Sequence, residues 1–353
     1  MQSYKAIGIM SGTSLDGLDI VLCEFSLQSK WNFSILKSKT IDYSKAWKEK
    51  LFNAPNLSGL DLIILHQQFG QYIGESVLAF LKNIDYKIDL IASHGHTVFH
   101  QPEKKLTLQI GDGNEIASTT GIKTISDFRS MDIALGGQGA PLVPIGDKLL
   151  FSEYDYCVNI GGFANISFDK NDIRFAYDIC PANIVLNSLA NKLGYPFDKG
   201  GKLGRLGKIN NELLNELNNI DYYSKRYPKS LGKEWLDISF TPILNAFKIS
   251  SEDQIRTIYE HIALQISSSV PNDNKYKILI TGGGAYNTFL IELIKQKTKS
   301  QIVIPNNIIV EYKEALIFAF LGILRLENEV NCLSSVTGAK RNSSGGNISL
   351  SNN

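Results

Sequence analysis

Residues 8–19 read GIMSGTSLDGLD and lie between two apolar runs, at residues 4–10 and 18–25. Two β-prone runs joined by a glycine-rich turn predict a β-hairpin. Glycine lets backbone N–H groups approach a phosphate closely, so this turn is a candidate phosphate loop. Asp16 and Asp19 would repel phosphate unless Mg²⁺, directly or through its bound water, lies between them. An ordinary hairpin turn explains this single stretch equally well.

The hairpin pattern returns at residues 156–168, where GGFAN occupies residues 161–165. A third glycine turn, at residues 282–284, follows an apolar run and precedes a helical pattern. Its N–H groups and the helix dipole suit an anion or a nucleotide, although a flexible connector explains the turn equally well. Strands and helices alternate throughout, so we predict an α/β fold with a duplicated lobe and a cleft between the halves.

Composition excludes several classes of protein. The chain has 353 residues, 43% of them hydrophobic, and a formal net charge of +1. This predicts two lobes of ordinary size and no nucleic-acid partner. Four widely spaced cysteines predict reduced, buried thiols rather than a zinc site or disulfides. No signal peptide or membrane span is visible, so we expect a soluble, cytoplasmic protein without a membrane partner.

The nucleotide-binding turns belong to neither of two common classes. The sequence contains no P-loop and no Rossmann fingerprint. Three turns in the order hairpin, hairpin and strand-to-helix match the way actin-like kinases hold the phosphates and adenosine of ATP. Together they favour ATP binding more strongly than any single turn does.

Long and unusual motifs continue along the chain beyond the first hairpin. They occupy residues 93–97 (SHGHT), 109–111, 127–129, 132–144, 159–162, 178–183, 281–287, 314–315 and 336–338. With these motifs the sequence resembles one family, the anhydro-N-acetylmuramic acid kinases of peptidoglycan recycling. The resemblance implies a two-lobed actin-like (ribonuclease H-like) fold, ATP and Mg²⁺ as cofactors, and a homodimer. It also implies that water opens 1,6-anhydro-N-acetylmuramic acid while O6 takes the γ-phosphoryl group, which gives N-acetylmuramic acid 6-phosphate.

The position that matches the family's catalytic base is Asp178. A carboxylate at the end of a strand and just before a helix is expected to stay ionised near the helix N-terminus. Taken alone, an Asp at this place is more often a helix N-cap. The resemblance favours the catalytic role.

Other candidate residues each have a structural alternative. Arg129 suits charge on phosphate or on the lactyl carboxylate of the substrate, or it forms a surface ion pair with Asp127 or Asp132. Gln138 suits sugar hydroxyls or loop solvation, and His94 suits the substrate or the core. Glu314 matches an acidic family position or simply favours the first turn of a helix.

The predicted site and lobes are as follows. The catalytic residues are Asp178 and Arg129. The ATP- and phosphate-binding residues are Gly12, Thr13, Ser14, Leu15, Asp16, Gly17, Leu18, Asp19, Gly161, Gly162, Gly282, Gly283, Gly284 and Asn287, with Asp16 as the metal ligand. The substrate-binding residues are His94, Gln138, Gly139, Asn183 and Glu314. The lobes are residues 1–135 and 136–340, and residues 341–353 form a disordered tail.

Four positions depart from the family pattern: His96, Met131, Ala182 and Asn187. They concern the sugar more than the nucleotide, so phosphoryl transfer is better supported than the sugar's identity. The alternatives are an actin-like kinase for another sugar or amino sugar, and an ATP-binding sensor without catalysis.

Overall fold

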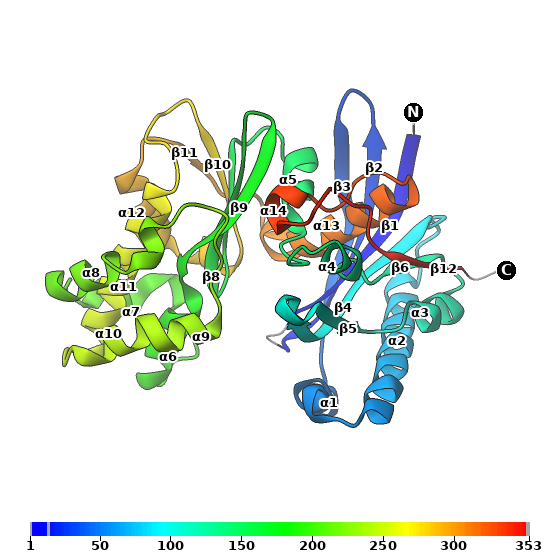
Figure 1. Ribbon diagram of the computed structural model, residues 1–353, viewed down its shortest axis with the longest axis horizontal. Coiled ribbons are helices and arrows are strands. Elements are labelled where there is room, and N and C mark those ends of the chain that lie inside the picture. The colour runs from blue at the N-terminus through cyan, green and yellow to red at the C-terminus, as the bar shows by residue number, and fades with distance from the viewer. Residues whose placement is uncertain (1, 13–14, 351–353) are drawn as a thin grey trace. The chain divides into compact units, whose positions relative to one another are not determined.

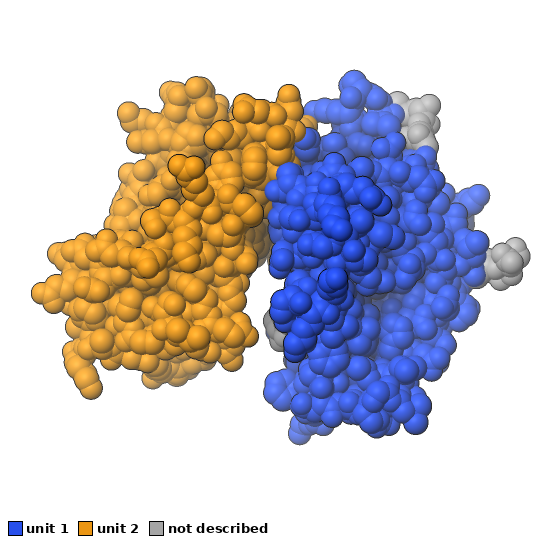
Figure 2. All heavy atoms as spheres, in the orientation of Figure 1, with its two compact units in different colours: residues 1–151, 312–353 blue, residues 152–311 orange. Residues whose placement is uncertain are grey.

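A computed structural model describes residues 2–12 and 15–350 of the chain, so Thr13 and Ser14 lie outside the described residues. The chain forms two compact units, residues 1–151 with 312–353 (unit 1) and residues 152–311 (unit 2), coloured separately in Figure 2. These borders differ from the expected ones. The first unit continues past residue 135 to Phe151, and the chain returns to it at Tyr312 because a late helix packs on its sheet.

Unit 1 is built on one mixed sheet (Figure 1). Its strands are β1 (Gln2–Ser11), β2 (Gly17–Leu27), β3 (Trp31–Asp42), β4 (Leu90–Gln101), β5 (Leu106–Ile110), β6 (Thr124–Ser126) and β12 (Asn347–Ser349). The spatial order is β12-β6-β4-β1-β2-β3, with β5 paired to β4. Strands β1, β4 and β6 are parallel, whereas β1, β2 and β3 form an antiparallel meander. Strand β12 pairs with β6, so the expected disordered tail is wrong for residues 347–349.

Unit 2 repeats this topology with a smaller sheet. Its strands are β7 (Tyr156–Ile160), β8 (Phe163–Lys170), β9 (Ile173–Pro181), β10 (Lys277–Thr281) and β11 (Gln301–Val303). The order β11-β10-β7-β8-β9 again combines an antiparallel meander with two parallel strands beside its first member. The predicted duplication, and with it the actin-like α/β fold class, is confirmed.

Helices cover the sheet of unit 1. They are α1 (Lys45–Asn53), α2 (Gly59–Leu81), α3 (Gly113–Thr120), α4 (Ser130–Ala134), α5 (Val143–Leu150), α13 (Asn307–Leu326) and α14 (Ser334–Thr337). Alternate residues of β1 serve opposite faces of the sheet. Ile7 and Ile9 join the apolar cluster of α2, while Gly8 lies against α13, where a Cβ would come within 1.9 Å of the Ala315 carbonyl oxygen.

Unit 2 has one long helix, α11, against which α6, α7, α8 and α12 pack. The helices of this unit are α6 (Asn183–Lys192), α7 (Lys202–Leu206), α8 (Asn211–Asn218), α9 (Lys233–Trp235), α10 (Thr241–Ala246), α11 (Ser251–Ser268) and α12 (Thr288–Lys297). Ser250 caps α11 by accepting a hydrogen bond from the N–H of Asp253.

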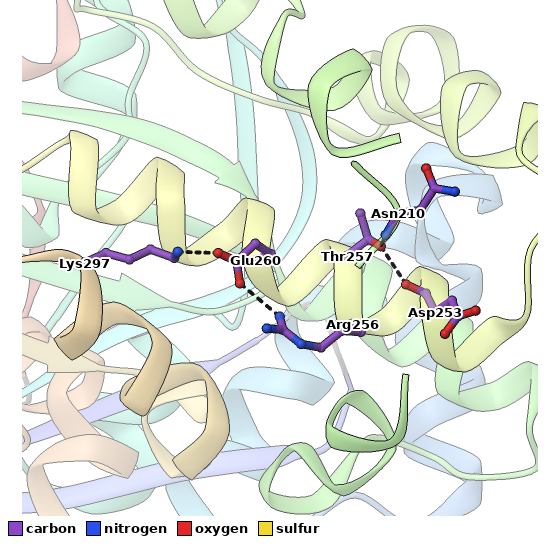
Figure 3. Close-up of polar contacts among 6 residues, drawn as sticks. All are labelled: Asn210, Asp253, Arg256, Thr257, Glu260 and Lys297. Atoms are coloured by element: carbon purple, nitrogen blue, oxygen red, sulfur yellow. Dashed lines mark hydrogen bonds and ion pairs between the residues drawn. The ribbon is translucent and has the colours of Figure 1, made fainter. Parts of the chain in front are cut away.

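Polar contacts tie α11 to its neighbours (Figure 3). Glu260 binds Lys297 of α12 and also accepts a hydrogen bond from Arg256, 3.0 Å away. Thr257 accepts a hydrogen bond at 3.0 Å from the N–H of Asn210, which precedes α8. These contacts hold α11 against α12 and against the start of α8.

Two further expectations concern the whole described chain. All four cysteines are buried thiols outside any disulfide, as predicted. Within residues 2–12 and 15–350, no helix combines the length and apolar character needed to cross a bilayer.

Candidate active site

The two glycine turns of unit 2 lie side by side at the carboxyl ends of the neighbouring strands β7 and β10. Gly282 has a φ of +81°, and a Cβ there would lie 2.8 Å from the carbonyl oxygen of Ile160. A Cβ on Gly284 would come within 2.2 Å of the Ile160 side chain. Only glycine permits this approach at Gly282 and Gly284, and residues 161–162 and 282–284 therefore lie together. Their binding of ATP stays a prediction.

Asn183, the first residue of α6, is hydrogen-bonded to the first of these turns. Its side-chain amide donates to the Ile160 carbonyl at 3.3 Å, and its backbone N–H donates to Gly161 at 3.1 Å. The carbonyl of Gly162 accepts the N–H groups of Ala182 and Ile184. The Gly161 N–H donates to the Phe163 carbonyl at 3.2 Å, so among the described contacts the Gly162 N–H is the one left for an anion.

Asn287 has a structural role beside the third turn. Its side-chain oxygen caps α12 by accepting the Leu290 N–H at 3.1 Å, and its amide donates to Tyr259 at 2.6 Å. The side chain is buried. Its backbone N–H donates to the Gly284 carbonyl and its carbonyl accepts the Ile291 N–H, so nucleotide binding by Asn287 stays a prediction.

Asp178 lies on β9, and the N-cap of α6 is Ala182. The N-cap alternative for Asp178 is therefore wrong. The Leu231 N–H donates to Oδ2 of Asp178 at 2.8 Å, and among the described residues no hydrogen bond reaches Oδ1. Burial raises the pKa of Asp178, and the Leu231 hydrogen bond opposes that rise. The sequence led us to expect that the helix N-terminus would lower the pKa of Asp178, but the effect of burial is the larger one.

In unit 1 the first glycine turn joins β1 to β2. Ser11 pairs with Leu18 and Met10 pairs with Asp19 across the hairpin. Leu18 is a fully buried core residue, while Asp16 is exposed. Asp19 accepts a hydrogen bond from Thr40 at 2.6 Å. Gly12 and Leu15 close the described ends of the turn through an N–H to carbonyl bond of 3.3 Å.

Arg129 follows β6 at the same sheet edge, because β1, β4 and β6 are parallel. Its Nε and one terminal nitrogen lie 3.1 and 2.9 Å from Nε2 of His94 on β4. The other terminal nitrogen donates to the Gly139 carbonyl at 2.7 Å. These partners replace the ion pairs with Asp127 and Asp132 that the sequence left open.

His94 has a defined tautomer. Its Nδ1 lies 2.9 Å from the carbonyl oxygen of Gly95, which can only accept, so Nδ1 carries the proton. Nε2 therefore accepts from Arg129. Burial and the neighbouring Arg129 charge hold the pKa of His94 well below its usual range. The described contacts make His94 a support for Arg129, and its contact with substrate stays a prediction.

A buried carboxylate organises the loop of Gln138 and Gly139. Asp132 accepts the Gly139 N–H at 2.7 Å, the Thr337 hydroxyl at 2.7 Å and the Cys332 thiol at 3.2 Å. The Gln138 N–H donates to the Thr337 carbonyl, and the Gln138 side chain is exposed. Sequence analysis missed this role of Asp132, since nothing local links residues 132 and 337.

Glu314 lies on α13, within the electrostatic reach of Arg129. Its side chain is accessible to solvent, yet protein atoms crowd it closely enough to raise its pKa, while the charge of Arg129 opposes the rise. Reduced hydration also lowers the pKa of Arg129 to about 10, which Glu314 opposes. The two groups thus belong to one charged cluster of unit 1.

Two departures from the family pattern lie inside the protein. His96 shares a hydrogen bond of 3.1 Å with Ser11 and packs against Phe69. Ala182 is fully buried at the start of α6. Met131, by contrast, is half exposed.

The chemistry of the first turn fits Mg²⁺. Asp16 and Asp19 offer carboxylate oxygens, the ligands that Mg²⁺ prefers, and Mg²⁺ bound to a nucleotide needs only one or two protein carboxylates. Within the part of the chain that the structure describes, no group of three or more His, Cys, Asp or Glu side chains could form a metal cage. Asp16 and Asp19 therefore suit an Mg²⁺ ion that arrives bound to the nucleotide.

The family model and the curated relatives agree on one family. A family model described as anhydro-N-acetylmuramic acid kinase matches residues 4–351. The anhydro-N-acetylmuramic acid kinase of Vibrio cholerae is 37% identical over 95% of each chain, and that of Aliivibrio fischeri is 34% identical over 96% of each chain. Among solved structures, (R)-2-hydroxyglutaryl-CoA dehydratase component A of Acidaminococcus fermentans covers 90% of this chain and 96% of its own at 13% identity, with a TM-score of 0.45. This chain belongs to the anhydro-N-acetylmuramic acid kinase family.

Proposed function

We propose that the protein is an ATP-dependent kinase that opens 1,6-anhydro-N-acetylmuramic acid with water and phosphorylates O6. The product is N-acetylmuramic acid 6-phosphate, in peptidoglycan recycling in the cytoplasm. The observation that carries the proposal is the geometry of Asp178. One carboxylate oxygen is fixed by a backbone N–H, the other is free of described partners, and burial raises the pKa. This is what a general base for water requires.

The reaction balances around Asp178. Its free oxygen takes a proton from water as the water oxygen attacks the anomeric carbon. The bond between that carbon and O6 breaks, O6 bonds to the γ-phosphorus, and ADP leaves. Phosphorus thus captures the leaving oxygen, which a general acid would protonate in an inverting glycosidase.

Arg129 is assigned to negative charge. Guanidinium has five N–H donors, and three are directed to His94 and Gly139. The remaining donors are suited to the phosphoryl group or to the lactyl carboxylate of the substrate. His94 is neutral and accepts hydrogen bonds on one side of the guanidinium, so it does not neutralise the positive charge of Arg129.

Backbone N–H groups are assigned to the nucleotide. Residues 161–162 and 282–284 of unit 2 suit the phosphates and adenosine, and the turn at residues 12–19 suits the transferred phosphate. Asn183 stays assigned to the sugar substrate. Asp16, directly or through water, and Asp19 would hold Mg²⁺, which neutralises charge on the phosphates when it is bound. Gln138 and Glu314 are assigned to sugar hydroxyl groups. A homodimer is also part of the proposal.

The deciding experiment combines labelled ATP, a panel of cell-wall sugars and ¹⁸O-labelled water. We expect phosphorylation of the anhydro sugar, with one ¹⁸O atom at the anomeric position. Asp178→Asn should lower kcat by about 100-fold or more, the usual size of a general-base contribution. Glu212→Gln, on the exposed face of α8, is the matched control. Unlabelled product would show that a free hydroxyl is the nucleophile, and full turnover by Asp178→Asn would remove it from the role.

A further inference from the structure

Three residues that follow α8 surround Asp178, and we name Tyr222, Lys229 and Leu231 the Asp178 clasp. The Asp178 N–H donates to the Lys229 carbonyl at 3.1 Å. The Leu231 N–H donates to Oδ2 at 2.8 Å, and the Tyr222 hydroxyl donates to the Asp178 carbonyl at 2.5 Å. The backbone and the carboxylate of one residue are therefore held by a single short segment.

The position of β9 explains why a clasp is possible. This strand is at the edge of the unit 2 sheet, where β8 is its strand neighbour. The polar backbone groups on the outer edge need partners. At Asp178 the Lys229 carbonyl and the Tyr222 hydroxyl supply them. The carboxylate is aligned by the Leu231 N–H, a main-chain group whose position does not depend on a rotamer.

Lys229 holds the clasp closed. Its ammonium donates to the carbonyl groups of Tyr222 at 3.0 Å and of Tyr223 at 3.3 Å. It also lies 4.6 Å from the centre of the Tyr222 ring and 5.5 Å from that of Tyr177. These hydrogen bonds and cation–π contacts fold residues 222–229 into one compact loop.

The clasp has a second anchor in α11. The Tyr223 hydroxyl lies 2.9 Å from Nε2 of His261, and Nδ1 of His261 lies 2.7 Å from the side-chain oxygen of Asn218. Nδ1 must donate to that oxygen, so Nε2 accepts from Tyr223. His261 is fully buried, which fixes Tyr223 relative to the core.

We propose that Lys229 is a positioning residue: it shapes residues 222–231 so that the Leu231 N–H fixes Oδ2 of Asp178 and leaves Oδ1 to accept the proton from water. The inference rests on the proposed function, in which Asp178 is the base. Lys229 itself touches no reacting atom. Its effect is expected on the geometry and the titration of Asp178.

Three titratable groups near Asp178 stay neutral at working pH, which leaves the Leu231 hydrogen bond as the interaction that a loosened clasp would change. Burial raises the pKa of the neighbouring Cys180 thiol and Tyr222 phenol, so both stay neutral at working pH. Burial lowers the pKa of His261 to about 3, so it stays neutral as well. Burial raises the pKa of Asp178, and the Leu231 hydrogen bond opposes that rise. Loosening the clasp must therefore move the acid limb of the kcat profile to higher pH.

The first test replaces Lys229 by methionine, which keeps the stem and removes the ammonium. We expect kcat to fall roughly 10-fold to 100-fold, the size of effect that a misplacement of about 1 Å produces, with the KM for ATP unchanged. The acid limb should move to higher pH. Lys225→Met, an exposed lysine of the same loop, is the control and should behave like the unaltered protein.

The second test addresses the hydrogen bond itself. Leu231→Pro removes the N–H donor, whereas Leu231→Ala keeps it, so only the proline variant should shift the acid limb. Circular dichroism reports whether each variant is folded, and if the proline variant is not, Lys229→Met decides the question. Unaltered kcat and pH profile in Lys229→Met, with Asp178→Asn inactive, would overturn the positioning role alone. Full activity of Asp178→Asn would instead overturn the proposed function.

Discussion

Replacing Asp132 by asparagine tests whether one buried carboxylate fixes the loop that carries Gln138 and Gly139. Asp132 is 1% exposed and accepts three hydrogen bonds, from Thr337, Cys332 and the Gly139 N–H. An amide has one oxygen. If that oxygen keeps the bonds to Thr337 and Cys332, the amide nitrogen faces the Gly139 N–H, and two buried donors then oppose each other.

The cost follows from these contacts. Losing a hydrogen bond to a charged acceptor costs about 1.5–3 kcal/mol, and a buried donor left unsatisfied costs about 1–3 kcal/mol more. Removing the buried charge recovers part of this. We expect a net loss of roughly 2–4 kcal/mol in the free energy of unfolding. The Gly139 carbonyl also holds Arg129, so kcat/KM should fall as well.

Urea denaturation followed by circular dichroism measures the stability, and hydrogen exchange of residues 133–141 measures the loop. Thr337→Val is the graded control, because it removes one donor and leaves the others; its expected cost is about 1–2 kcal/mol. An unaltered urea midpoint together with unaltered exchange in Asp132→Asn would refute the reasoning.

Three further predictions concern buried charge. Asp178→Asn should unfold at a higher urea concentration than the unaltered protein at neutral pH, because burial raises the pKa of Asp178 and the folded state carries the cost of its charged form; a lower midpoint would contradict this. Burial lowers the pKa of His96 to about 4 and of His261 to about 3. Their contribution to stability is therefore full above about pH 6.5 and is lost as the pH falls, by about 2 kcal/mol each at pH 5; thermal melts across this range check it, and His261→Gln should flatten the loss. Lys313→Met leaves Asp147, 2.6 Å away in a buried ion pair, without that partner and should cost about 3–5 kcal/mol; Lys313→Met with Asp147→Leu should recover most of it in urea titrations.

The glycine turns and the hairpins were predictable because they depend on neighbouring residues in the sequence. A turn that needs glycine at Gly282 is visible in the sequence, because a φ of +81° is a property of one residue and its neighbours. The same holds for the hairpin at residues 161–162 and for the α/β pattern. The position of Asp178 came from resemblance to a family, since an aspartate before a helix is ambiguous by itself.

Contacts between distant segments were not predictable in this way. The apolar residues of helix α2 recur at helical spacing, but they do not share one environment: Leu60, Ile63 and Leu78 are exposed, whereas Phe69 and Ile73 are buried. Periodicity identifies a helix, but the face that is buried depends on which surface packs against it. The return of α13 to unit 1 depends in the same way on the space left by Gly8.

The sequence by itself determined the glycine turns, the two repeated hairpins and the family, because each is written in neighbouring residues. The tertiary structure alone decided that Leu231 holds Asp178, that Asp132 holds Gly139, and that β12 closes the sheet of unit 1. The physical reason is that each of these hydrogen bonds uses a backbone group on at least one side. Any residue with an N–H or a carbonyl group can make them, so only the three-dimensional path of the chain selects the partner.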